Sequence, residues 1–179
     1  MGIALADCAY EMGADVTLVS TFSVNKPYKN IVTESAQEME KAVKSELMEQ
    51  DCVIMAAAVA DYRIKEYSEQ KMKKGAGVNE ITLELVQNPD ILKEISAMDA
   101  KVKIVGFCAE SENLLENAKE KIQKKGCDYL VANDISRKDI GFSSDINEVY
   151  ILDKNLKISH IGRDTKLNIA KQILEKIFE

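Results

Sequence analysis

The sequence predicts an α/β fold: a Rossmann-like, three-layer α/β/α sandwich with a mostly parallel sheet and a C-terminal antiparallel hairpin. Helical and strand patterns alternate along the 179 residues; one predicted strand, 52–58, is a continuous apolar run, and 102–108 is predicted as another buried strand. Such runs are typical of strands that are buried on both faces of a parallel sheet. The length suits one domain with a core of its own. Because no repeat or linker interrupts the pattern, residues 1–179 are predicted to form a single domain.

The first half of the chain supplies helix and strand signals in turn. The opening helix is rich in Ala and Leu and stops at Gly13, a natural helix terminator. A run of capping-type residues, 33–38, opens the next helix. The predicted order is helix 2–12, strand 15–20, a polar loop with Pro27 and Asn30, a helix from Thr33 to about Glu49, and strand 52–58.

The second half continues the alternation after a charged stretch, 61–80, that has no apolar periodicity. Asn88-Pro89 is expected to start a short helix, with Asn as the N-cap and Pro at the first helical position. The predicted elements are strand 81–86, that short helix, strand 102–108, helix 113–125 ended by Gly126, strand 129–132, a hairpin of 149–152 with 156–161, and a final amphipathic helix capped by Asp164. Folds of this class usually start with a strand and a Gly-rich turn, so that first strand is expected to be absent here.

The composition argues against several kinds of partner. A formal net charge of −6 does not suit binding to nucleic acid or to an anionic membrane. No apolar run approaches the ~20 residues of a membrane span, and the first residues lack the basic region of a signal peptide, so a cytoplasmic protein is expected. The four cysteines form no CxxC pair and His160 is alone. We therefore expect buried thiols in a reducing compartment and a structural histidine.

The clearest candidate for a ligand site is the apolar run that ends in Ala56, Ala57 and Ala58 and is followed by Asp61. Ligands of open parallel sheets bind just beyond the carboxyl ends of the strands. Small side chains at that end would let a ligand lie close to the backbone, and Asp61 would add one charge at the rim. From these residues alone, a core strand that ends in a polar turn is an equally good interpretation.

A lysine-rich segment follows this strand. Lys71, Lys73 and Lys74, ahead of Gly75 and Gly77, could form a cationic arm that closes over phosphates. A solvated run of charges is the plainer interpretation. The chain has no GxGxxG, GxxxxGK[ST] or GxSxG motif, so no standard dinucleotide, P-loop or hydrolase fingerprint is available.

Two further places could meet a phosphate or a base. The helix start at Asn88-Pro89 offers free N–H groups to an anion, although it could equally be a well-capped helix. Phe107 ends another strand after a glycine and suits either a flat base or core packing. Lys121 and Lys125 lie four residues apart on one helical face, which could also be a solvent face.

Six short segments, each weak alone, together resemble one family because they occur in order along nearly the whole chain. That family is bacterial phosphopantothenoylcysteine synthetase, the second activity of the bifunctional coenzyme A biosynthesis protein. The segments that carry the resemblance are AAVADY at 57–62, KMKK at 71–74, NPDIL at 88–92, VGFCAE at 105–110, VAND at 131–134 and FSSDIN at 142–147.

The resemblance implies a ligase that uses CTP as co-substrate and Mg²⁺. In that reaction the carboxylate of 4′-phosphopantothenate is activated as an acyl-cytidylate with release of pyrophosphate, and the amine of cysteine then displaces CMP. Lys71 matches the family's essential loop lysine, Asp61 a nucleotide contact that could also hold the metal, and Ala57 and Ala58 the small residues beneath the substrates. The implied nucleotide-binding residues are Met55, Ala56, Ala57, Asp61, Lys71, Pro89, Asp90, Ile91, Leu92, Phe107, Lys121 and Lys125.

The resemblance also carries expectations about partners. It implies a homodimer, and fusion to or association with a phosphopantothenoylcysteine decarboxylase, although FMN is not predicted for this chain. Family members carry a further strand and a Ser/Gly-rich turn with an asparagine ahead of the segment that matches Met1-Gly2, so an N-terminally truncated domain is expected. The alternatives are a truncated CTP-binding module without full ligase activity, an NAD(P)-binding Rossmann oxidoreductase, and a purely structural domain.

Overall fold

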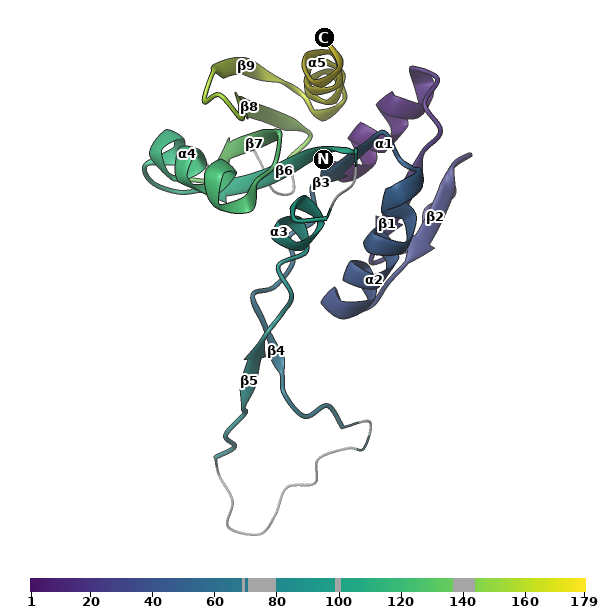
Figure 1. The fold of residues 1–179 in the computed structure, drawn as a ribbon, viewed down its shortest axis with the longest axis vertical. Helices are drawn as coiled ribbons and strands as arrows, with labels where there is room; N and C mark the ends of the chain where they lie inside the picture. The colour runs from purple at the N-terminus through teal and green to yellow at the C-terminus, as the bar shows by residue number, and fades with distance from the viewer. Residues whose placement is uncertain (69, 71–79, 99–100, 137–143) are drawn as a thin grey trace.

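The computed structural model describes residues 1–68, 70, 80–98, 101–136 and 144–179. Its largest sheet has the order β3-β6-β7-β8-β9, parallel from β3 to β7 and antiparallel from β7 to β9. A separate parallel pair joins β1 to β2, and β4 and β5 form an antiparallel pair in a protruding arm (Figure 1). The strands are β1 (Thr17–Ser20), β2 (Lys29–Val32), β3 (Cys52–Met55), β4 (Tyr62–Ile64), β5 (Leu85–Gln87), β6 (Lys103–Glu110), β7 (Tyr129–Asp134), β8 (Ile146–Asp153) and β9 (Ile158–Thr165).

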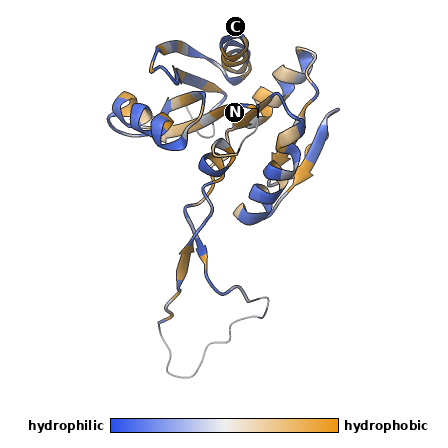
Figure 2. Cartoon of the chain, in the orientation of Figure 1, coloured by the Kyte–Doolittle hydropathy of each residue, from blue (hydrophilic) through white to orange (hydrophobic). Residues whose placement is uncertain are grey.

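Helices cover both faces of the large sheet. One face packs against the first and last helices in a buried cluster that includes Leu5, Val105 and Ile173. The other face packs against the remaining helices in a cluster that includes Met39 and Ile122. Figure 2 shows hydrophobic residues along these helices and the sheet, with hydrophilic residues dominating the outer surfaces. The helices are α1 (Gly2–Glu11), α2 (Ala36–Glu46) with a 3₁₀ turn (Leu47–Glu49), α3 (Ile91–Ser96), α4 (Leu114–Lys125) and α5 (Lys166–Phe178).

This arrangement confirms the predicted fold class, including the antiparallel hairpin at the end. It also contains two strands that the sequence did not predict. β2 lies in the expected polar loop, where Asn30 Nδ2 donates to Leu18 O at 3.1 Å and to Ser20 Oγ at 2.9 Å. β4 lies in the charged stretch and pairs with β5, which replaces the predicted strand 81–86. Both are edge or protruding strands, and strands of that kind need no buried apolar pattern.

Two predicted helix caps are wrong by one or two residues. The N-cap of α3 is Asp90, whose Oδ1 accepts a hydrogen bond from Lys93 N at 3.2 Å, and not Asn88. The N-cap of α5 is Thr165 and not Asp164. In both cases several polar residues precede the helix, and local propensity does not decide which of them the tertiary structure uses as the cap.

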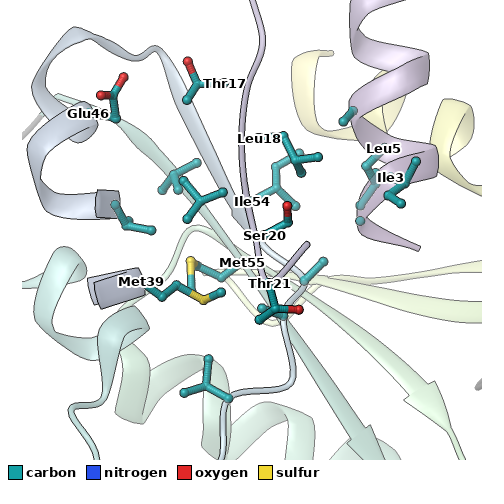
Figure 3. A pocket seen from close by; sticks show the side chains of 18 of the residues that line it. Ile3, Leu5, Thr17, Leu18, Ser20, Thr21, Met39, Glu46, Ile54 and Met55 are labelled. Atoms are coloured by element: carbon teal, nitrogen blue, oxygen red, sulfur yellow. The ribbon is translucent and has the colours of Figure 1, made fainter. Parts of the chain in front are cut away.

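The apolar run predicted as strand 52–58 is a strand only over its first four residues, and all four are half-buried. Within the described ranges β3 pairs only with β6, and β1 pairs only with β2. The second edges of β1 and β3 line a cavity of about 700 Å³ (Figure 3). The continuous apolar pattern therefore correctly predicted that both faces of this strand pack against apolar side chains. The predicted full burial of the strand was wrong, because all four of its residues are half-buried.

Candidate functional site

The segment after β3 forms one end of this cavity. Met55 packs with the cluster on the α2 side and Ala56 with the cluster on the α1 side, so alternate side chains still face opposite layers. Ala57 and Ala58 then leave the sheet, are exposed, and line the cavity. The predicted small-residue floor is therefore accessible at the carboxyl end of the strand.

The arm leaves the sheet at Asp61 and returns at Asn88, and hydrogen bonds join these two points. Asn88 N donates to Asp61 O at 2.8 Å, and Asn88 Nδ2 donates to Ala60 O at 2.8 Å. Arg63 Nη1 donates to Gln87 O at 2.7 Å and to Asn88 Oδ1 at 3.2 Å. These bonds fix the base of the arm beside the small-residue floor, where the side chain of Asp61 is exposed.

Both predicted lysines of α4 are engaged with carboxylates. Lys125 Nζ donates to Asp90 Oδ2, and Lys121 Nζ donates to Glu110 Oε1 at 2.9 Å. Burial lowers the pKa of Lys121, but the hydrogen bond to Glu110 and the negative charge of the same carboxylate outweigh it, so that this pKa is raised, with a smaller contribution from Asp61. Lys121 is therefore held in its charged form.

The two carboxylates are held in their ionised form. Burial raises the pKa of Asp90, but the hydrogen bonds from Lys125 and from the backbone of Lys93 outweigh it, and the net pKa is lowered. The hydrogen bond from Lys121 lowers the pKa of Glu110. A phosphate that binds either lysine must therefore replace a carboxylate partner or share the lysine with it.

The start of α3 offers less to an anion than the sequence suggested. The carboxylate of Asp90 already accepts one of its N–H groups, and the helix has six residues. Ile91 is buried in the core. A Cβ added to Gly106 would lie 2.6 Å from Leu92 Cδ2, so Leu92 packs directly on the sheet. Pro89, the remaining residue predicted at this helix start, is half-buried.

Phe107 is not brought together with the lysines. It packs with the cluster on the α1 and α5 face, whereas Cys108 belongs to the opposite cluster. Because side chains alternate along a strand, Glu110 and its partner Lys121 lie on the α4 side, away from Phe107. The residues predicted to bind the nucleotide thus lie on both faces of the sheet. One ligand could contact residues of both faces only if it lay above the carboxyl edge of the sheet.

Lys71, the predicted catalytic residue, lies outside the described residues, as does the rest of its lysine-rich segment. For the implied Mg²⁺, the exposed carboxylate of Asp61 is a suitable donor, because this ion commonly binds one or two carboxylates together with substrate phosphates. The described parts of the chain contain no cluster of three or more potential metal-ligating side chains. The donors present therefore fit a metal held largely by the nucleotide.

Several residues of this edge were not predicted from the sequence. Thr21 and Phe22 follow β1 and line the cavity, so the rule that selected Ala57 would also have selected them. The side-chain bonds of Asn88 and the pairing of Glu110 with Lys121 had no local signal, because both depend on contacts between separate elements.

Fold and site together define the class of this protein: a Rossmann-like α/β domain with small residues and charged side chains at the carboxyl edge of its sheet. Within this class, the chain belongs to the family described as the DNA/pantothenate metabolism flavoprotein C-terminal domain, whose profile matches residues 1–179. This membership confirms the family resemblance drawn from the six segments.

Relatives and solved structures agree with this membership. The chain is 37% identical to the coenzyme A biosynthesis bifunctional protein CoaBC of Vibrio parahaemolyticus, with 100% of this chain and 46% of that protein covered. It is 40% identical to the protein of the same name from Escherichia coli, with 84% and 38% covered. A crystal structure of the C-terminal domain of CoaBC superposes with a TM-score of 0.79 at 33% identity, covering 98% of this chain and 79% of the other. The chain thus spans less than half the length of these two curated relatives, which are named as bifunctional.

A more distant structure shares the fold. A Cab2 variant in complex with phosphopantothenate-cysteine has a TM-score of 0.73 at 15% identity, covering 98% of this chain and 75% of the other. Within the described ranges, no helix combines the length and apolar character that a membrane span requires.

Proposed function

We propose that this chain is a phosphopantothenate–cysteine ligase module of coenzyme A biosynthesis. CTP and the carboxylate of 4′-phosphopantothenate form an acyl-cytidylate and pyrophosphate, and the amine of cysteine then attacks the acyl carbon, loses a proton and releases CMP. The observation that carries the proposal is the exposed floor of Ala57 and Ala58, with Asp61 and the two lysines of α4 at the same edge, in a member of this family. The complex of the distant Cab2 fold relative names the product of this ligation.

The charges at the edge support a need for additional cations. Asp61, Asp90 and Glu110 carry three negative charges and Lys121, Lys125 and Arg63 carry three positive charges, so this edge has no excess of positive charge to offer a triphosphate. The reaction brings a carboxylate against a triphosphate, and that approach requires neutralisation of negative charge. Mg²⁺, when bound, supplies such neutralisation.

The chain's own residues take distinct roles in this proposal. The methyl groups of Ala57 and Ala58 allow the acyl and phosphate groups to lie against the backbone. Lys121 and Lys125 orient the nucleotide phosphates by exchanging their carboxylate partners. Lys71 supplies a further positive charge to the reacting groups from the arm.

Lysine variants of α4 test this assignment. Lys121→Met and Lys125→Met are expected to raise the KM for CTP at least about tenfold, because each removes a charge-assisted hydrogen bond worth roughly 1.5–3 kcal/mol. Lys124→Met is the matched control, since Lys124 is exposed and pairs with Glu120 on the outer face of the same helix. Pyrophosphate release with CTP or ATP, and CMP release on addition of cysteine, are measured separately.

A second candidate is a nucleotide-binding module that does not complete the ligation. The cavity beside β3 favours it, because one wall of the carboxyl edge is open next to the small-residue floor. CTP binding without pyrophosphate release would reject the ligase for this chain and favour the module. Unchanged CTP kinetics in all three lysine variants would instead reject the assigned site.

A further inference from the structure

Arg63, in β4 at the base of the arm, has only neutral hydrogen-bond partners among the described residues. Its Nη1 donates to Gln87 O at 2.7 Å and to Asn88 Oδ1 at 3.2 Å, and within the described ranges it forms no ion pair. We propose that the free side of this guanidinium binds a substrate oxyanion other than the nucleotide phosphates: the phosphate of 4′-phosphopantothenate or the carboxylate of cysteine. This inference rests on the proposed function and adds one substrate contact to it.

The charge of Arg63 is available in a way that the neighbouring ammonium groups are not. The nearby lysines are each paired with a carboxylate: Lys65 with Glu84, Lys121 with Glu110 and Lys125 with Asp90. An anion binds one of those lysines only by competing with its carboxylate. An arginine side chain stays charged in proteins, so an anion that binds Arg63 gains an ion pair without breaking one.

The two hydrogen bonds of Arg63 leave one particular side of the guanidinium free. The two N–H groups of Nη1 match the two acceptors on Gln87 and Asn88, whereas Nε–H and the N–H groups of Nη2 have no partner among the described residues. Nε–H and one N–H of Nη2 are parallel, and this fork matches two oxygens of a carboxylate or a phosphate. The free side is therefore suited to bidentate binding of an oxyanion.

The arm holds this side chain in place before a ligand arrives. Arg63 and its cross-strand neighbour Val86 are both half-buried, whereas the residues on either side of each of them are exposed. Because side chains alternate along a strand, Arg63 and Val86 lie on the more buried face of the β4–β5 pair. A long side chain that is already fixed by two hydrogen bonds loses little further conformational freedom on binding, which favours affinity.

Arg63 also lies close to the small-residue floor. Asn88, which accepts a hydrogen bond from Arg63, donates through Nδ2 to Ala60 O at 2.8 Å and lines the same cavity as Ala57 and Ala58. One residue thus separates the guanidinium from the floor, on the side where the arm leaves the domain (Figure 1).

The proposed reaction supplies two oxyanions for this place. The nucleotide phosphates are assigned to the lysines of α4, which is a separate element. The other anionic groups that stay intact during the ligation are the phosphate of 4′-phosphopantothenate and the carboxylate of cysteine. Both present two oxygens to a fork, and binding of either one positions a reactant over the floor.

Steady-state kinetics of the full chain test this contact. Arg63→Met is expected to raise the KM for 4′-phosphopantothenate or for cysteine at least about tenfold, with less than about a twofold change in kcat, because it removes charge-assisted hydrogen bonds from binding. Arg63→Lys keeps the charge without the fork and should recover part of the affinity. Lys65→Met is the matched control, since it removes a positive charge of the same arm that Glu84 already compensates.

The Nε–H signal of Arg63 in heteronuclear NMR spectra gives a readout that needs no turnover. It is identified as the signal that Arg63→Lys removes. Separate titrations with 4′-phosphopantothenate and with cysteine are expected to shift it for one of the two, and the same substrate should be the one whose KM rises. Sodium sulfate at equal concentration is the control for binding of an unspecific anion.

Several outcomes would overturn the proposal. These are a signal that neither substrate shifts, an equal shift with sulfate, which means an adventitious ion only, a rise confined to the KM for CTP, or the same kinetic change in Lys65→Met. A purely structural role of Arg63 in holding the arm would lower kcat and leave the Nε–H signal unmoved. A chain that releases no pyrophosphate would reject the ligase, and the NMR titrations would still decide on Arg63, so the two failures are distinguishable.

Discussion

Gly106, in β6, lies directly beneath Leu92 of α3. An added Cβ would lie 2.6 Å from Leu92 Cδ2 and 3.0 Å from Leu130 Cδ1. We expect Gly106→Ala to lower the free energy of unfolding by about 1–3 kcal/mol, the usual cost of overpacking a core. Urea unfolding measures this, with Gly162→Ala as the control because nothing lies within 4 Å of an added Cβ there. Equal losses in the two variants would contradict the contact, and Leu92→Ala should partly rescue the first.

The pair of Asp90 and Lys125 should be visible in the pH dependence of stability. Since the folded pKa of Asp90 is lowered, its ionised form contributes stability above the unfolded pKa of about 4, and this contribution is lost as the pH falls through the folded pKa. Lys125→Met should therefore lower the unfolding free energy by about 0.2–1 kcal/mol at pH 7, and the difference from the unsubstituted protein should shrink below pH 4.

Thermal and urea unfolding from pH 2 to pH 8 check this expectation. Lys124→Met is the control, because it removes one exposed ammonium from the same helix turn. A deficit of the Lys125 variant that stays constant down to pH 2 would show that Asp90 is not the titrating group.

At the scale of residues, the sequence could predict residues whose position follows a general rule, such as the binding of ligands at the carboxyl ends of strands. Ala57 and Asp61 were predicted because they lie at and just beyond the end of an apolar strand, and in the structure they are exposed at that edge. Phe107 was selected in the same way, but the alternation of side chains along β6 directs it to the opposite face. Glu110 could not be selected, since its pairing with Lys121 depends on how α4 packs on the sheet.

At the scale of elements, Asn88 is expected to hold the arm to the domain. Asn88→Ala removes the bonds of its side chain to Ala60 O and to Arg63, while the backbone bond to Asp61 remains. We expect faster amide exchange in β4 and β5, with a change in global stability below about 1 kcal/mol, because the bonds lie at the base of the arm and outside the two buried clusters.

Hydrogen exchange by mass spectrometry measures this change, and Asn155→Ala in the exposed turn before β9 is the control. Under the proposed function the variant also loses ligase activity, since the arm carries Lys71. Unchanged exchange in β4 and β5 would mean that pairing of the two strands alone holds the arm.

The elements differ in how well their sequences define them. The run of capping-type residues at 33–38 correctly predicted the start of a helix, and in the structure it forms a capping box in which Ser35 Oγ accepts a hydrogen bond from Glu38 N at 3.2 Å. β2 and β4 were not predicted because their residues lack the apolar pattern of a buried strand. Each is held in place by its pairing with a neighbouring strand. Such pairing is set by tertiary contacts and not by local propensity.

At the scale of the whole molecule, the arm bears on assembly. Ile64 and Leu85 are cross-strand neighbours and are 46% and 59% exposed, which is unusual for large apolar side chains in a protruding pair. We propose that the arm contributes to the homodimer implied by the resemblance. Sedimentation should show a dimer that Ile64→Lys and Leu85→Lys dissociate, whereas Leu167→Lys on α5 leaves it intact; a monomer at all concentrations would reject the dimer.

The overall architecture was predictable because helix and strand patterns alternate along nearly the whole chain. The separation of the β1–β2 pair from the larger sheet was not predictable from those patterns, since they carry no information on which strand edges meet. The sequence therefore predicted the layers, and coordinates were needed to locate the cavity between the sheets.

The hydrogen bonds at the base of the arm have a further consequence for chain entropy. Lys65 N donates to Glu84 O at 2.9 Å, so the two ends of the segment between these residues already meet. Closing a loop costs entropy that grows with the logarithm of its length, by about 0.6 kcal/mol for each doubling. That cost is incurred when the domain folds and not when a substrate binds. The hydrogen bonds between the two sides of the arm therefore have to outweigh this cost before β4 and β5 can pair.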